Sequence, residues 1–193
     1  MVSNMMKKSH RTFCLVVCML LVSLGGMAQE KPKPEVIQAT AFGNDRAAGK
    51  TFSVNIIINS YSTPEEQQAL VAVFNSGGMN ALVKALEKSK SKGRLAVTGT
   101  VGYDISYVSQ SPTDDGRKIR IVTTRPIHFR EAYNSGRSMQ YQLSGVELNL
   151  SDTQSKSTGT LIIAAKLRIN KDKQLEIESF QSPWRLANIM KRQ

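Results

Sequence analysis

Alternation of apolar and polar residues predicts β-strands over most of the chain. The clearest early example is TFSVNIIINSYS, residues 51–62, in which the residues of one parity are apolar and would share a buried face. These residues are Phe52, Val54, Ile56 and Ile58. The segment VIQATAF, residues 36–42, fits a shorter strand, and GNDRAAGK between the two fits a turn. The first predicted elements are therefore two neighbouring strands.

The period of the apolar residues becomes helical after Ser62. Thr63-Pro64-Glu65-Glu66 supplies an N-cap, a proline at the first helical position and the glutamate of a capping box. The apolar residues at helical spacing are Leu70, Val73, Phe74, Met79, Leu82, Val83 and Leu86. Gly77-Gly78 interrupts this stripe and predicts either a kink or a tight link between two helices.

The remainder of the chain alternates again and predicts about five or six antiparallel strands. RLAVTGTVGYDISYVSQ, residues 94–110, is too long for one straight strand, so we expect it to bend at Gly99 and Gly102. The turn SPTDDG leads into RKIRIVTTRPIHF, residues 117–129, which we expect to return antiparallel. In the next strand the apolar parity slips at Ser144-Gly145, which indicates a bulge.

These elements predict an α+β fold. We expect a curved antiparallel sheet, a partial barrel or meander of about six to eight strands, with one apolar face packed against the helical pair. A β-sandwich with the helices at one end is the alternative. The predicted organisation is a signal peptide at residues 1–28, a linker at 29–35 and a single α+β domain at 36–193.

The N-terminal segment has the three parts of a secretory signal. Lys7, Lys8 and Arg11 precede a short apolar stretch, and Gly26-Met27-Ala28 places small residues before a cleavage point at Gln29. An uncleaved anchor is the alternative, but about twelve apolar residues fall short of the roughly 20 that span a bilayer. We expect an exported protein, periplasmic or extracellular, with no transmembrane segment after cleavage.

Cleavage would change the composition. Removing 28 of 193 residues leaves 165, with neither of the two cysteines and one of the two histidines, His128. That excludes disulfides, thiolate zinc and multi-histidine metal sites, and we expect no metal and no cofactor. The segment holds three of the 26 basic residues and none of the 15 acidic ones, which leaves a net charge of +8. Such a charge favours anionic partners, although nucleic acid is not expected for an exported chain without a nucleic-acid-binding motif.

The stretch TTRPIHFREAYNSG, residues 123–136, holds the remaining histidine. His128 has the parity of the polar face, which favours a solvated strand residue over a catalytic base, and we predict no catalytic residue. Arg125 has the parity of the apolar face, and Glu131 continues that parity. Arg125 would therefore pair with a carboxylate, reach the rim of the sheet, or be turned outward by a bulge at Pro126.

A ligand site can be built on this stretch. Arg125 would contact an anion at the mouth of a pocket, with Glu131 nearby and the amphipathic rings of Tyr103, Tyr107 and Tyr141 as its walls. The alternative is that the apolar residues under the helices form a solid core.

Four segments together resemble an uncharacterised family of predicted secreted bacterial proteins. They are GGMNALVKAL, GTVGYDISYVSQSPTDDGRKI, TTRPIHFREA and LEIESFQSPWRLANI. The resemblance spans about Phe52 to Ile189. It implies an exported protein and supplies no activity or site residue.

The favoured function is a non-enzymatic binding protein for a small apolar or anionic ligand, or for an anionic envelope polymer. A structural or assembly factor that acts through protein contacts is the alternative, and an enzyme such as a hydrolase is the third.

Overall fold

A computed structural model describes residues 33–44, 47–98, 101–125, 127, 142–172, 174–179 and 182–192. Residues 32–193 form one compact unit, and the fold described below belongs to it. The predicted signal peptide lies outside the described residues, as do His128, Glu131 and Tyr141.

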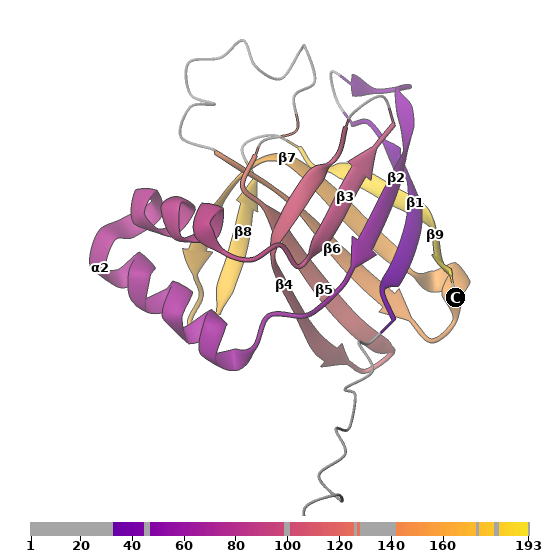
Figure 1. Ribbon diagram of the computed structural model, residues 1–193. Coiled ribbons are helices and arrows are strands. Elements are labelled where there is room, and N and C mark those ends of the chain that lie inside the picture. Colours follow the sequence, from indigo (N-terminus) through magenta and orange to yellow (C-terminus); the bar gives the residue numbers. More distant parts are fainter. Residues whose placement is uncertain are drawn as a thin grey trace, which may run out of the picture. The chain divides into compact units, whose positions relative to one another are not determined.

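The described residues contain nine strands, one α-helix and one short 3-10 helix (Figure 1). The strands are β1 (Glu35–Phe42), β2 (Thr51–Ile58), β3 (Gly93–Val97), β4 (Tyr103–Thr113), β5 (Gly116–Thr123), β6 (Leu143–Ser151), β7 (Thr158–Ile169), β8 (Leu175–Ser179) and β9 (Trp184–Arg192). The helices are α2 (Pro64–Lys88) and η3 (Gln154–Lys156).

The sheet closes on itself as an antiparallel barrel. Neighbouring strands from β1 to β7 pair in chain order, and β9 closes the ring by pairing with both β7 and β1. Leu186 of β9, for example, lies opposite Gly159 of β7 on one side and opposite Ala41 of β1 on the other. The short strand β8 pairs with the far part of β7 and lies outside this ring of eight.

The predicted fold class was therefore wrong. We expected a partial barrel covered by a helical pair, whereas the barrel is closed and carries one helix. The physical reason is that alternation reports which face of a strand is buried, not which strand it pairs with. A closed barrel fills its inner face with side chains from its own strands, so it needs no helical cover for that face.

Two apolar clusters occupy the two faces of the sheet. The inner cluster fills the barrel with residues such as Ile37, Ile56 and Ile119, all 0% exposed. The outer cluster lies between the sheet and its covering elements, and it joins Leu82 and Leu86 of α2 to Tyr107 and other strand residues. The sheet is thus buried on both faces where α2 and β8 lie against it.

Helix α2 begins as the sequence predicts and bends at the expected place. Thr63 is its N-cap and forms a capping box with Glu66. Gly78 has φ 65° and ψ −159°, which is not helical, and the helix folds there into two arms on one side of the barrel (Figure 1). By length and composition alone this helix could cross a membrane, but that is weak evidence, and its fully buried residues pack on the barrel.

Two other local predictions had opposite outcomes. The register of the β6–β7 pair shifts between Leu143 and Gly145, which confirms the predicted irregularity at Ser144-Gly145. The prediction of one long bent strand over residues 94–110 was wrong. This segment forms two strands, β3 and β4, which pair antiparallel with Leu95 opposite Tyr103. Gly102, with φ +88°, comes directly before β4 and belongs to the connection rather than to a bend within one strand.

Candidate functional site

One end of the barrel carries polar side chains that face inward. Glu35 has the parity of the buried Ile37 on β1, and Arg117 has the parity of the buried Ile119 on β5. On β9, Lys191 lies two residues after the buried Ile189. Inward-facing positions in the middle of these strands are apolar, so the barrel interior ends here in a charged layer.

These side chains form one connected cluster. Tyr61 donates a hydrogen bond of 2.8 Å to Glu35 Oε2, and Arg117 Nη1 donates one of 3.1 Å to the Tyr61 hydroxyl. Arg117 Nη1 also donates to Gln110 Oε1 at 2.9 Å, and its Nη2 pairs with Glu35 Oε1. Lys191 Nζ lies 3.5 Å from the same oxygen. Residues from β1, β4, β5, β9 and the segment before α2 therefore meet at one point.

The cluster keeps Glu35 ionised. Burial by itself would raise the pKa of Glu35, but hydrogen bonds from Tyr61 and Arg117 and the charges of Arg117 and Lys191 outweigh it. The pKa of Glu35 therefore lies below its ordinary value of 4.5. Burial and the hydrogen bond to Glu35 raise the pKa of Tyr61 to about 12. At neutral pH the cluster therefore contains neutral Tyr61, the carboxylate of Glu35 and the two cations Arg117 and Lys191.

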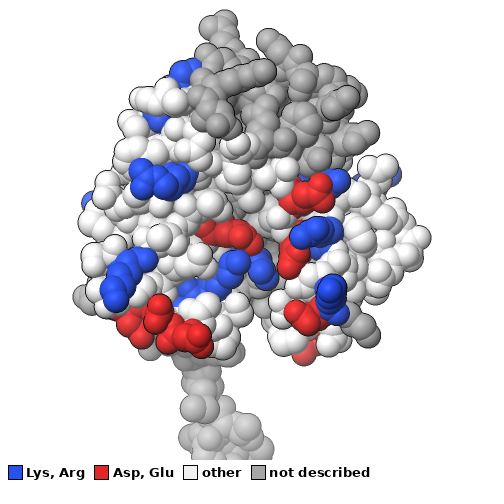
Figure 2. Space-filling model, turned by 180° about the vertical axis from the view of Figure 1, so that it is seen from behind, with Lys and Arg blue, Asp and Glu red and all other residues white. Residues whose placement is uncertain are grey.

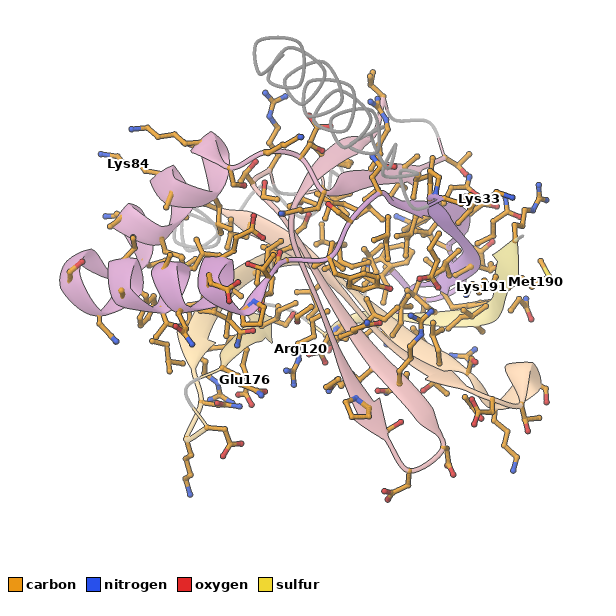
Figure 3. The ribbon with its side chains drawn as sticks, turned by 60° about the horizontal axis from the view of Figure 1, so that its bottom comes forward. Lys33, Lys84, Arg120, Glu176, Met190 and Lys191 are labelled. Carbon is orange, nitrogen blue, oxygen red and sulfur yellow. The ribbon has the colours of Figure 1, made fainter. Side chains whose placement is uncertain are left out.

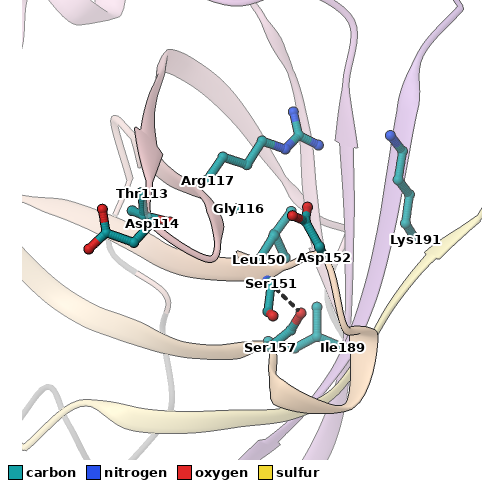
Figure 4. Close-up of a pocket in the computed structure, with 10 residues that line it drawn as sticks. All are labelled: Thr113, Asp114, Gly116, Arg117, Leu150, Ser151, Asp152, Ser157, Ile189 and Lys191. Carbon is teal, nitrogen blue, oxygen red and sulfur yellow. Dashed lines mark hydrogen bonds between the residues drawn. The ribbon is translucent and has the colours of Figure 1, made fainter.

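A hollow of about 480 Å³ opens above this cluster at the barrel end (Figure 4). Arg117 and Lys191 extend toward each other from different strands on its wall, and Leu150 and Ile189 supply apolar surface. Its rim comes from the β4–β5 and β6–β7 turns. The described residues that line it are Thr113, Asp114, Gly116, Arg117, Leu150, Ser151, Asp152, Ser157, Ile189 and Lys191.

A second hollow of about 390 Å³ lies at the other end of the β4–β5 pair. It brings together Arg125 and Tyr103, two of the residues that the sequence suggested for a ligand site. Tyr107 is not part of it. Tyr107 is 2% exposed and belongs to the outer apolar cluster, where burial raises the pKa of its phenol.

Arg125 is exposed, which fits a place at the rim of the sheet or an outward turn at Pro126, and Pro126 lies outside the described residues. Ile127, two residues after Arg125, is buried. The carbonyl oxygen of Arg125 lies 2.9 Å from the hydroxyl oxygens of both Thr123 and Ser144, which are fully buried and hydrogen-bonded to each other. The backbone at Arg125 is thus fixed while the guanidinium remains in solvent.

Several charged residues outside these hollows pair with one another on neighbouring strands. Glu147 on β6 contacts Arg120 at 2.9 Å and Lys118 at 3.6 Å, and Glu176 on β8 contacts Arg168 at 3.1 Å. Arg120 and Glu176 lie close together beside α2 (Figure 3). On the side of the molecule that Figure 2 displays, positive and negative side chains are interspersed. Within the described ranges, no three His, Cys, Asp or Glu side chains are grouped to hold a metal ion.

Sequence reasoning missed the charged cluster at the barrel end. A usable signal existed, because Arg117 continues the parity of Ile119 and Ile121, as Arg125 does at the other end of the same strand. The involvement of Glu35 and Lys191 depends on strand pairing across the whole chain, which parity does not report. Comparisons with protein-family models, curated proteins and solved structures give no match, so the site rests on this chain's own geometry.

Proposed function

We propose that this protein binds a small anionic ligand with an apolar part at the mouth of its barrel, without acting on it chemically. The observation that carries this proposal is the convergence of Arg117 and Lys191 on the 480 Å³ hollow, next to Leu150 and Ile189. Barrel mouths are common positions for ligand sites, and this volume lies within the usual range for small molecules.

The charge arrangement favours an anionic group. Glu35 is shared by two cations, so the three side chains together carry one positive charge. The separation of 3.5 Å between Lys191 and Glu35 is longer than an ordinary N–H···O hydrogen bond, so Lys191 keeps donors for a ligand. A carboxylate or phosphate placed beside Lys191 would complete the balance of charge.

The packing below the hollow limits how deep a ligand can lie. The inner apolar cluster includes Val108, Leu148 and Leu161, all 0% exposed, so the barrel interior is filled with side chains. A ligand would therefore lie at the mouth, with its charged group at Lys191 and its apolar part on Leu150 and Ile189. An extended anionic polymer would instead favour a surface of one charge sign, and the face in Figure 2 has interspersed charges.

The test compares two ligands that differ in charge. Octanoate and octanol are titrated into the protein that lacks residues 1–28, and binding is followed by calorimetry. We expect octanoate to bind saturably. Lys191→Gln should weaken its affinity about fivefold, which corresponds to a loss of roughly 1 kcal/mol of binding free energy. Native mass spectrometry of the purified protein should also show a bound small anion.

The matched control is Arg192→Gln. Arg192 is the next residue on β9 and is exposed, but it does not line the hollow, and its replacement removes the same charge. Octanoate affinity should be unchanged in this variant. Equal binding of octanol and octanoate, or equal loss in both variants, would contradict an anion site at Lys191.

A further inference from the structure

The second hollow differs in chemistry from the barrel mouth. It lies where the end of α2, the start of β4 and the residues after β5 meet. Its lining is polar and carries both signs of charge, with Arg125 opposed by Glu87 and Asp104. The described lining residues are Glu87, Ser89, Ser91, Gly102, Tyr103, Asp104, Ser106, Thr124 and Arg125.

Several of these side chains keep their hydrogen-bonding groups available. Among the described residues, the side chains of Tyr103, Asp104 and Arg125 make no hydrogen bond or ion pair. Asp104 therefore presents two acceptor oxygens, Arg125 presents up to five N–H donors, and Tyr103, whose ring packs against the inner apolar cluster, presents its hydroxyl group. A ligand would be the partner for all three.

The walls of this hollow are held in place by hydroxyl groups. The Ser89 hydroxyl group donates a hydrogen bond of 2.7 Å to the carbonyl of Leu86 and lies 3.3 Å from the carbonyl of Ser106 as a second acceptor. This contact joins the end of α2 to β4. On the other side, Thr123 and Ser144 hold the carbonyl of Arg125. Binding groups carried by fixed backbone lose little conformational freedom when a ligand arrives.

We infer that this hollow is a second binding site, for a neutral polyhydroxylated ligand of the monosaccharide class. Carboxylate oxygens accept hydrogen bonds from hydroxyl groups, and a guanidinium donates to hydroxyl or ring oxygens. The hydroxyl group of Tyr103 can donate to a sugar hydroxyl group and accept from another. An anionic ligand would meet Glu87 and Asp104 beside the single cation, so the charge balance disfavours it. The volume of about 390 Å³ accommodates a small ring ligand.

This inference is independent of the proposed anion site, because the two hollows share no lining residue. The test uses glucose, galactose and N-acetylglucosamine at millimolar concentration with the protein lacking residues 1–28. Saturation-transfer NMR reports which sugar binds, and a titration gives its affinity. We expect at least one sugar to bind, and Asp104→Asn and Arg125→Gln each to weaken that binding at least threefold.

Controls separate the site from the rest of the molecule. Asp114→Asn and Lys191→Gln change the other hollow and should leave sugar binding unchanged, and circular dichroism should show every variant folded. Arg125 is exposed, so Arg125→Gln tests the site even if Asp104→Asn is less stable. The inference is overturned if none of the three sugars binds saturably, if binding survives both replacements, or if phosphate binds at Arg125 while the sugars do not.

Discussion

The ammonium group of Lys92 lies 2.6 Å from Oε1 and 2.7 Å from Oε2 of Glu66. The same Oε2 accepts the backbone N–H of Thr63 at 2.9 Å, which is one half of the capping box of α2. The backbone of Lys92 also donates to the carbonyl of Ile105 on β4. Lys92 therefore joins the first turn of the helix to the barrel, next to the two hydrogen bonds between Ser62 and Val108.

Replacing Lys92 by methionine should destabilise the protein by about 1–2 kcal/mol, because the carboxylate of Glu66 loses its cation while remaining half exposed. The side chain of Lys92 is 11% exposed, so methionine fills the same space and isolates the effect of charge. Urea unfolding followed by circular dichroism measures the change. Lys90→Met, at an exposed position nearby, should change stability little.

Acid should destabilise the protein through Glu66 and Glu35. The hydrogen bond from Lys92 and the Thr63 backbone lower the pKa of Glu66, and the barrel-end cluster lowers that of Glu35. A carboxylate whose folded pKa is depressed stabilises the fold above its unfolded value of 4.5, and this contribution is lost as pH falls through the lower folded pKa.

Urea midpoints measured from neutral pH downward check this expectation. The double variant Glu35→Gln, Glu66→Gln should start less stable and lose less stability on acidification than the original chain. An identical pH dependence in the two proteins would show that other carboxylates control acid unfolding.

Tyr61 should ionise late in an alkaline titration. Burial and Glu35 raise the pKa of Tyr61 from 10.0 to about 12. An alkaline titration followed by ultraviolet absorbance should therefore show a tyrosine that ionises near pH 12, and Tyr61→Phe should remove this step. A raised folded pKa stabilises the fold below the unfolded value, and that stability is lost as pH rises from 10.0 through about 12. Glu35→Gln should move this late ionisation to lower pH.

The hydroxyl pair at the end of β5 should behave as one unit. Thr123 Oγ1 lies 2.5 Å from Ser144 Oγ, and both oxygens lie 2.9 Å from the carbonyl oxygen of Arg125. Each hydroxyl group has one proton, so one donates to the other hydroxyl while its partner donates to the carbonyl. Thr123→Val and Ser144→Ala should each cost about 1–2 kcal/mol, and the double variant should cost less than their sum. A double-mutant cycle from urea unfolding gives the coupling. Strictly additive losses would mean that the two hydroxyl groups act separately.

Gly78→Ala should destabilise the protein by about 1–3 kcal/mol although space for the new methyl group exists. The φ of 65° and ψ of −159° at Gly78 are available to glycine alone, so alanine must change the bend between the two arms of α2. Gly49→Ala is the matched control, because it has φ +82° and open surroundings but lies in a loop. We expect a smaller loss there, because a loop can adjust its backbone more easily than the bend that joins the two arms of α2.

Local features of this fold could be predicted from the sequence where neighbouring residues determine them. The capping box of Thr63 and Glu66, the kink at Gly78 and the buried parity of Val54, Ile56 and Ile58 all follow from short segments. Capping chemistry and pleat alternation act within a few residues, so a single segment contains the whole signal.

Closure of the barrel could not be predicted in the same way. It depends on β9 pairing with β1, where Val36 lies opposite Arg192, and no local pattern specifies that partner. The same limit hid the charged cluster, since Glu35 and Arg117 are distant in sequence. Of the residues that the sequence suggested for a ligand site, Arg125 and Tyr103 line one hollow, whereas Tyr107 is buried in the outer apolar cluster.

The pairing of the first strand with the last has a consequence for how the chain is made. During synthesis, β1 offers one side to β2, and its other side stays without a partner until residues 184–192 have emerged. An open strand edge of this kind recruits other extended chains. The nascent chain therefore keeps an open edge on β1 until β9 has formed, and loss of residues Trp184–Arg192 would leave that edge open permanently.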